Sequence, residues 1–443
     1  MTTPDPVVAK LQALVRIPTV STRDEEQLDT TAFDALLAEL AKQFPRVFGE
    51  LEVTRIERHG LLLHWRGASD RRSVVLMAHL DVVPVDETAP WQHPAFAADV
   101  VAGAVWGRGT LDDKGAVSAI CEAVEQLLTD GVTPAQDVWL SFGADEEVSG
   151  RCAPAAVEAL RQRGVEPWFV LDEGGAVAAD AFPGVPKPLA VVGVTEKGTT
   201  NLRLRTQGRG GHSSMPSRMD TTARLARAIV RLEHAPFPAR VHAPTLEMLE
   251  RVAPEAPVQL RGLIANAHRA KPLLARALVA AGPETAAMTR TTATVTTLEA
   301  SPALNVIASS ATAGVNVRVL VGDTVESVVE HVRRAIHDPK VEIEVVEPGE
   351  ASPVSPTDDA AFRLVESAIE DVFPDAIATP YIMMGATDAR FFTAICERVY
   401  RFTPFRMSRE HRASLHSFDE HLGVDALVDG VRWYRHLLES LPA

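Results

Sequence analysis

Residues 137–147 read "DVWLSFGADEE", an apolar run typical of a buried strand followed by a turn that crowds three acids together. The three acids are Asp145, Glu146 and Glu147. Like charges at the end of a buried strand repel one another and lose hydration, so they are unfavourable unless something positive neutralises them. This stretch therefore predicts a buried strand that ends at a cation-binding cleft.

The flanking sequence predicts an α/β domain around that strand. Short apolar runs alternate with amphipathic helical segments between residues 73 and 175, which is typical of a mostly parallel sheet covered by helices. After about residue 195, alternating strands and helices predict a four-stranded antiparallel sheet with helices on one side. We expect a catalytic domain formed by residues 1–194 and 351–443, interrupted by an inserted α+β domain at 195–350.

Composition excludes several classes of function. The chain has 443 residues, of which 46% are hydrophobic, and a net charge of −15 without a long block of one sign. This balance disfavours nucleic acids and anionic membranes as partners. The sequence shows neither a signal-like N-terminus nor 18 consecutive apolar residues, so we expect a cytoplasmic protein. Its three cysteines are far apart and predict neither a disulfide framework nor a thiolate zinc site.

Polar residues gather where the predicted strands end. In open parallel sheets the ligand site lies beyond the carboxyl ends of the strands. Two other predicted strands end in polar residues at the same edge as residues 145–147, and a predicted helix starts there. Together they supply one imidazole and several carboxylates. These residues are His79, Asp81, Asp112, Asp113, Asp172 and Glu173.

Such a group of ligands points to two divalent metal ions. Imidazole with carboxylates and no thiolate suits zinc, with cobalt or manganese as substitutes, and one tetrahedral ion needs fewer ligands than are present. Of the adjacent Glu146 and Glu147, one can bind metal while the other acts as general base towards the attacking water. Taken singly, these residues have ordinary explanations as an edge histidine, a helix cap and solvated turns. Their joint placement at consecutive strand ends favours the metal site.

Five stretches in this order resemble the metallopeptidase family M20: "HLDVVP", "GRGTLDDKGA", "GADEEVSG", "LDEGG" and "EKGTTNLRLRTQGRGGHSSMP". The resemblance extends from "LVRIPTVS" to "LHSFDEHL" and is nearest to the branch of carboxypeptidase S and the N-fatty-acyl-amino-acid hydrolases. It implies a zinc-exopeptidase-like catalytic domain with a mostly parallel central sheet. The inserted domain, with its four-stranded antiparallel sheet, would be a lid or dimerisation domain.

The resemblance also implies a role for each site residue. Asp112 would bridge two zinc ions, with His79 and Asp172 completing one and Glu147 and His416 the other. Glu146 would be the general base, and Asp81 would orient His79. A cis peptide is expected between Asp112 and Asp113. His416 is preferred to His411 and His421 because the family pattern H-x-x-x-E matches His416 and Glu420.

Further residues would contact the substrate. The resemblance implies that His212 polarises the scissile carbonyl, either from a partner subunit or after closure over its own site. Asn305 and Arg318 would hold the substrate carboxylate, although a strand arginine is also often simply solvated. Gly385, Thr387 and Arg390 would form a loop near the substrate. Ala386 stands where the family usually has glycine, and "NVIA" lacks the usual proline, so both departures bear on substrate fit.

The predicted function is hydrolysis of an amide bond next to an amino acid with a free carboxylate. Small peptides and N-acyl-amino acids are the expected substrates, which leaves carboxypeptidase, dipeptidase and N-acyl-amino-acid amidohydrolase open. A homodimer through the inserted domain is compatible with this function. A non-catalytic binding protein of the same fold would lack a ligand or the base, and none is missing. A two-metal phosphoesterase is disfavoured because no phosphate-gripping basic cluster accompanies the motifs.

Overall fold

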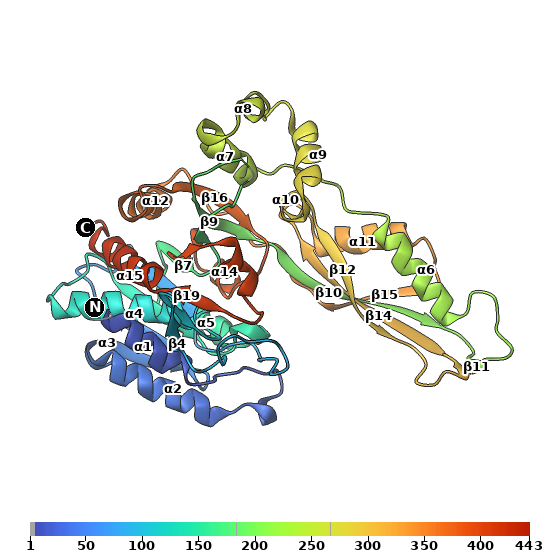
Figure 1. Ribbon diagram of the computed structural model, residues 1–443, viewed down its shortest axis with the longest axis horizontal. Coiled ribbons are helices and arrows are strands. Elements are labelled where there is room, and N and C mark those ends of the chain that lie inside the picture. Colours follow the sequence, from blue (N-terminus) through green and yellow to red (C-terminus); the bar gives the residue numbers. More distant parts are fainter. Residues whose placement is uncertain (1–4, 183, 266) are drawn as a thin grey trace.

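The computed structural model describes residues 5–182, 184–265 and 267–443. It contains a large mixed sheet and a separate four-stranded sheet, which lie side by side along the longest axis of the molecule (Figure 1). Strand β9 (Leu189–Glu196) of the large sheet leads almost directly into β10 (Gly198–Gln207) of the small one. The α/β class with two sheets, as predicted from the sequence, is confirmed.

The large sheet has ten strands in the order β1-β2-β6-β3-β7-β17-β9-β8-β18, with β16 also paired to β9. Its central pairs are parallel, and antiparallel pairs occur towards the β1 edge and around β9. The other strands are β1 (Glu52–Ile56), β2 (Gly60–Trp65), β3 (Val74–His79), β6 (Val138–Gly143), β7 (Phe169–Asp172), β8 (Ala176–Ala178), β16 (Ile377–Met383), β17 (Val399–Arg401) and β18 (Arg406–Met407).

Helices cover both faces of the large sheet, which explains its continuous apolar runs. Every residue of β3 and of β6 is buried, as expected for strands covered on both sides. One hydrophobic cluster joins the sheet to α1 (Pro6–Val15), α2 (Thr30–Gln43), α3 (Pro45–Glu50), α4 (Lys114–Thr129), α12 (Ala360–Val372) and α15 (Val424–Glu439). A second cluster joins it to α5 (Cys152–Gln162) and α13 (Ala389–Phe392).

The small sheet has the order β12-β14-β10-β15, and all neighbouring strands are antiparallel. Its strands other than β10 are β12 (Thr292–Glu299), β14 (Ser310–Val319) and β15 (Val341–Glu347). Along β14 buried and partly buried residues alternate, because one face packs on α6 (Thr221–Glu233) and α11 (Val325–Ile336). A short pair, β11 (Gly211–His212) and β13 (Val306–Ile307), lies at the far end of this sheet (Figure 1).

The first helix after α6 does not pack on the same sheet as α6. The sequence predicts helices on one side of the small sheet, but α7 (Ala243–Val252) packs against β16 of the large sheet. Leu246 and Leu249 share a hydrophobic cluster with Leu189, and Ile377 packs against that cluster. The helices that follow α7 are α8 (Val258–Ala265), α9 (Lys271–Ala281) and α10 (Pro283–Ala287). The division into domains at 195 and 350 stays a prediction.

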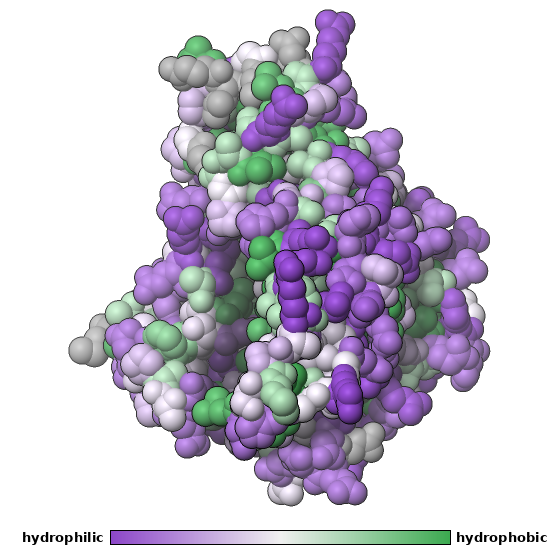
Figure 2. Space-filling view, turned by 90° about the vertical axis from the view of Figure 1, so that its right-hand side faces the viewer, coloured by the Kyte–Doolittle hydropathy of each residue, from purple (hydrophilic) through white to green (hydrophobic). Residues whose placement is uncertain are grey.

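The remaining elements are a small third sheet, a short helix and several 3-10 turns. A three-stranded sheet of β4 (Asp99–Val101), β5 (Ala104–Trp106) and β19 (His421–Gly423) lies beside the short helix α14 (Arg409–Ser414). Three single 3-10 turns occur at η1 (Glu25–Gln27), η2 (Glu146–Val148) and η3 (Ala253–Glu255). Of the helices in the described ranges, none is both long and apolar enough to cross a membrane. The face shown in Figure 2 is mostly hydrophilic.

Candidate active site and metal centre

The site lies where β3, β6 and β7 end. His79 is the last residue of β3, and its partner in the neighbouring strand β6 is Gly143. Three residues after Gly143 the chain enters the 3-10 turn η2, which starts with Glu146 and Glu147. Asp172 is the last residue of β7, which pairs with β3 on its other side. The parallel strands thus bring these side chains to one edge of the sheet.

Asp112 stands at the centre of the site. Its Oδ1 lies 2.8 Å from Nε2 of His79, and its Oδ2 lies 2.9 Å from Nε2 of His416. The same His416 nitrogen is 3.1 Å from Oε2 of Glu147. Asp112, Glu147 and His416 therefore form one group of ligand atoms that could hold a metal ion. The Asp112–Asp113 peptide is cis, as the resemblance implies.

The second group of ligand atoms contains Glu173, the neighbour of the predicted ligand Asp172. It consists of His79, Asp112 and Glu173, with Oε1 of Glu173 3.6 Å from Nε2 of His79. The carboxylate of Asp172 instead accepts a hydrogen bond of 2.8 Å from the backbone N–H of Ala389. Asp172 belongs to neither group within the described residues. Glu173 follows the last residue of β7, and its side chain, not that of Asp172, lies beside His79.

Asp81 ties His79 to the turn that carries the two glutamates. Its carboxylate is fully buried and accepts hydrogen bonds of 3.1 Å from the backbone N–H groups of both Glu146 and Glu147. Nδ1 of His79 lies 3.0 Å from the backbone carbonyl of Asp81 and 3.4 Å from its carboxylate. Asp81 can therefore orient the imidazole through its backbone as well as through its side chain.

Burial dominates the electrostatics of Glu146. It raises the pKa of this carboxyl well above its ordinary value, and the charges of Asp388, Asp112 and Asp81 act in the same direction. The charge of His79 opposes this rise. A carboxylate whose pKa is raised towards the working pH is a better proton acceptor and donor, which suits a general base.

The donor groups fit divalent metal ions. Burial lowers the pKa of His79, but hydrogen bonds to Asp112 and Asp81 outweigh it and raise the pKa well above the usual value. Hydrogen bonds to Asp112 and Glu147 raise the pKa of His416 to about 10. Oε1 of Glu147 is buried without a hydrogen-bond partner. The carboxylates thus attract positive charge at the places where imidazole and carboxylate ligands would hold metal ions.

We expect metal binding at this site to release protons and to strengthen as the pH rises. In the metal-free protein His416, with its pKa of about 10, carries a proton at neutral pH, and a metal ion must displace that proton from Nε2. Between pH 6 and 8 the affinity should therefore increase. Calorimetric zinc titrations in two buffers of different ionisation enthalpy measure the protons released. A binding enthalpy that does not depend on the buffer would contradict the expectation.

His212 and Asn305 lie away from the metal cluster within this chain. His212 is an exposed residue of β11 at the far end of the small sheet, and its Nδ1 lies 2.8 Å from Oγ of Ser214 (Figure 1). The backbone carbonyl of Asn305 accepts a hydrogen bond from Ser213, so the two predicted residues lie close to each other. Neither contacts a predicted metal ligand here.

Arg318 lies in β14, and no carboxylate of the described part of the chain forms an ion pair with it. Its guanidinium donates to Oγ1 of Thr199 at 2.7 Å and to Oδ1 of Asn316 at 3.1 Å, and burial lowers its pKa. Lys197 is buried near this guanidinium, and burial and then the charges of Arg318 and Arg290 lower its pKa to about 8, which still leaves most of its ammonium groups charged at pH 7. Lys197 was not among the predicted site residues, although it lies in the "EKG" of the motif that carries the resemblance.

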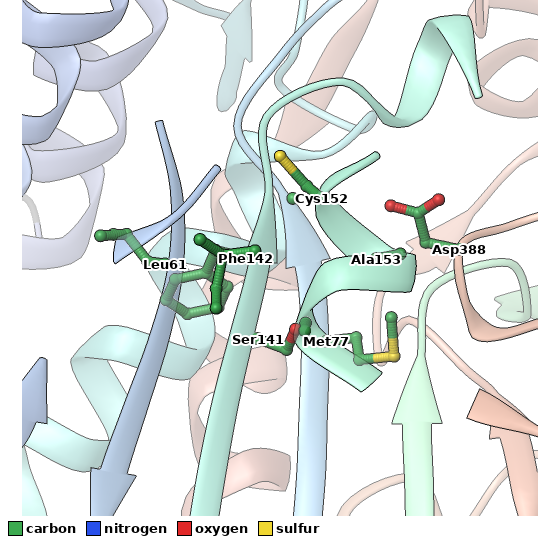
Figure 3. A pocket seen from close by; sticks show the side chains of 10 residues that line it. Leu61, Met77, Ser141, Phe142, Cys152, Ala153 and Asp388 are labelled. Carbon is green, nitrogen blue, oxygen red and sulfur yellow. The ribbon is translucent and has the colours of Figure 1, made fainter. Parts of the chain in front are cut away.

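The predicted substrate loop packs against buried charges. Oγ1 and the backbone N–H of Thr387 donate to Glu196 at 3.1 and 3.2 Å. Arg390 donates to the Thr387 carbonyl at 2.7 Å, and Gly385 approaches Met383. A small, mostly apolar cavity beside β6 and α5 is lined by residues that include Met77, Phe142, Cys152 and Asp388 (Figure 3). None of the predicted site residues lines this cavity.

Known proteins resemble this chain along most of its length. It is 35% identical over 405 residues to a probable carboxypeptidase S-like protein of Dictyostelium discoideum, covering 90% of this chain and 77% of that protein. It is 35% identical over 441 residues to the human N-fatty-acyl-amino acid synthase/hydrolase PM20D1, covering 97% and 86%. The structure of an M20 family metallo-carboxypeptidase from Sulfolobus solfataricus has a TM-score of 0.72 at 16% identity, covering 98% and 99%, and shows the same fold.

The two sheets, the carboxylate–imidazole cluster and these relatives define the protein as an enzyme of the metallopeptidase and amidohydrolase class. The model of peptidase family M20/M25/M40 matches residues 75–440, and the chain belongs to this family. The resemblance noted in the sequence is therefore confirmed.

Proposed function

We propose that this enzyme is a two-zinc hydrolase that cleaves an amide bond next to an amino acid with a free carboxylate. The observation that carries the proposal is the position of Asp112, whose two oxygens each contact a different histidine of the two ligand groups. A single carboxylate shared by two groups is the arrangement expected of a two-metal site. The names of the relatives, a carboxypeptidase S-like protein and an N-fatty-acyl-amino acid hydrolase, support this substrate class.

Five residues would hold the metal ions. Asp112 would serve both ions, His79 and Glu173 would complete the first set, and Glu147 and His416 the second. Bound zinc would supply Lewis acidity, which polarises the scissile carbonyl and lowers the pKa of water. Cobalt or manganese could take its place, because imidazole and carboxylate also suit these ions.

Glu146 would move the proton during the reaction. As general base it takes a proton from the attacking water, and as general acid it then passes this proton to the nitrogen of the leaving amine. Burial raises its pKa, which makes its carboxylate a stronger proton acceptor than that of an exposed glutamate. Asp81 would keep this carboxyl in place by holding the backbone N–H groups of Glu146 and Glu147.

Positive charge near the junction of the two sheets would hold the substrate carboxylate. Among the residues that the structure describes, the hydrogen-bond partners of Arg318 are neutral oxygens, so its guanidinium can pair with an anion. Lys197 strengthens the positive potential there. Asn305 and the loop with Gly385, Thr387 and Arg390 remain proposed substrate contacts.

A hydrolysis screen tests the function. N-acyl-amino acids and dipeptides are incubated with the enzyme in the presence of zinc or of a chelator, and the released amino acid is measured. We expect cleavage of at least one of the two groups, loss of activity with the chelator and recovery when zinc is restored. The same substrates esterified at the free carboxylate should react poorly. Activity only towards phosphoesters with manganese, or no hydrolysis of either group, would overturn the proposal.

Paired substitutions of the adjacent acids in "LDEGG" test which one binds metal. We expect Glu173→Gln to lose the ion of the His79 group, because its carboxylate lies beside the imidazole. Asp172→Asn should keep two ions, since its carboxylate bonds to the backbone of Ala389. Zinc content after dialysis against a metal buffer measures the difference. The reverse pattern would restore Asp172 as the ligand.

Mixing two inactive variants tests how His212 acts. If His212 serves the site of a partner subunit, hybrids of His212→Ala and Glu146→Ala chains contain one site with both residues intact, and activity returns. If it closes over its own site, every site in the hybrid lacks one of the two residues. We expect recovery, because His212 lies far from its own cluster (Figure 1). Mixtures that stay inactive despite proven subunit exchange would favour closure within one chain.

A further inference from the structure

We propose that Arg108 and Glu420 are positioning residues that form a clamp between the loop of Asp112 and the loop of His416. The clamp would set the distance between these two residues and thereby the affinity of the metal site that they share with Glu147. This inference rests on the proposed function, because it assigns a role towards the metal ions. Neither residue contacts an imidazole of the site in the bonds described below, so both act through the backbone of the ligand loops.

Glu420 holds the backbone of the Asp112 loop. Its Oε1 accepts hydrogen bonds from the N–H groups of Gly109 at 3.0 Å, Leu111 at 2.8 Å and Asp112 itself at 3.2 Å. Glu420 comes from the other loop, four residues after His416. Its carboxylate therefore connects the backbone of the shared ligand to the segment that carries the second histidine.

Arg108 makes the connection in the opposite direction. It belongs to the Asp112 loop, and its NH2 group donates to the backbone carbonyl of Ser417, next to His416, at 2.7 Å. Its NH1 group donates to Oε2 of Glu420 at 2.5 Å. Each loop thus sends a charged side chain to the backbone of the other, and the two side chains bind each other in the middle.

Burying the charges of Arg108 and Glu420 costs hydration free energy, which their hydrogen bonds must offset. Glu420 is fully buried and Arg108 is 2% exposed, and two such charges lose more hydration than a simple apolar contact would. Except for their mutual ion pair, the side-chain bonds of both residues go to the two ligand loops. A pair that served packing alone would not need four bonds to the backbone of these loops.

The backbone of both loops needs such support. Gly109 has φ +87°, and a Cβ there would lie 2.8 Å from Cγ1 of Val82, so only glycine fits. His416 has φ +58°, which is unfavourable for a residue with a side chain. The hydrogen bonds of Glu420 to the Asp112 loop and of Arg108 to the His416 loop would stabilise these backbone conformations. Because His79 lies on strand β3, outside the clamp, loosening the clamp should weaken the His416 site more than the His79 site.

The test compares Glu420→Gln with a control that changes a partly buried, hydrogen-bonded carboxylate elsewhere. In the Gln variant the amide oxygen can still accept from the backbone, but the amide nitrogen opposes the N–H groups of Arg108. Asp137→Asn is the control, because Asp137 holds His64 and the N–H of Gly67 at the start of β6, away from the strand ends. Zinc binding is followed in a series of metal buffers, and cobalt binding is followed by visible absorption.

We expect wild type to bind two ions, and Glu420→Gln to bind its second ion about ten- to a hundredfold more weakly. Activity of the variant should return as free zinc is raised. Asp137→Asn should bind both ions like wild type although it melts at a lower temperature. If Glu420→Gln does not fold, Arg108→Lys decides, because lysine lacks the planar fork needed to reach both Glu420 and Ser417.

The outcomes separate this inference from the proposed function. If the wild type binds two ions and hydrolyses its substrates, yet the folded variants bind both ions with wild-type affinity, the pair only stabilises the fold and the clamp is refuted. A wild type that binds no second ion overturns both the clamp and the two-metal function.

Discussion

Replacing Glu146 by Gln is expected to lower kcat by roughly 10²–10⁴-fold while both metal ions stay bound. The amide cannot take the proton from the attacking water or return it to the leaving amine. Glu146 belongs to neither group of ligand atoms, so metal binding should not depend on it. Asp81 accepts from the backbone N–H groups of this turn and not from the Glu146 side chain, so we expect the change to be confined to the carboxyl group. Steady-state kinetics with a substrate from the hydrolysis screen, together with zinc content, measure the effect.

The neighbouring Glu147 supplies a matched control. Glu147→Gln changes the same chemical group in the same turn, but Oε2 of Glu147 lies 3.1 Å from Nε2 of His416. We expect this second variant to lose the ion of the His416 group as well as activity. A Glu146→Gln enzyme that turns over at the wild-type rate, or that loses an ion as Glu147→Gln should, would refute the role of Glu146 as general base.

The large sheet was predictable because its strands carry their signal locally. The apolar runs that end at His79 and Asp172 are short, continuous and separated by helices, which is typical of strands buried on both faces. The place of α7 was not predictable in the same way. An amphipathic pattern shows that a helix has an apolar face, but it does not show which sheet that face covers. Leu246 and Leu249 could have packed on either sheet.

Some features of the candidate site could likewise be predicted from local sequence patterns, and others could not. That carboxylates and a histidine meet at one edge follows from the strand ends, because parallel strands bring their carboxyl ends together. Which of the adjacent Asp172 and Glu173 faces His79 depends on the direction of one side chain at the end of β7, which adjacent acids in a sequence do not reveal. The distance of His212 from the cluster depends on how the two sheets are placed, and no local pattern encodes that.

Asp112→Ala is expected to remove both metal ions and to lower kcat/KM by at least about 10³-fold, because the metal ions stabilise transition-state charge by several kcal/mol. Each of the other four members of the two groups belongs to one group only, whereas Oδ1 of Asp112 contacts His79 and Oδ2 contacts His416. Without this carboxylate each group keeps only two ligands, fewer than the three that a catalytic zinc site needs. Zinc content at a free-zinc concentration that saturates the wild type measures the loss.

Asp112→Asn is expected to cause a smaller loss of metal ions than Asp112→Ala. The amide keeps one oxygen that can act as a ligand, while its NH2 group faces the second site, so this variant should hold at most one ion. Glu420 binds the backbone of the loop and not the Asp112 side chain, so we expect its bonds to hold the loop in both variants. An Asp112→Ala protein that still binds two ions would mean that each group is complete without the shared carboxylate. The site would then consist of two independent metal ions, and a mechanism that depends on their sharing one ligand would be wrong.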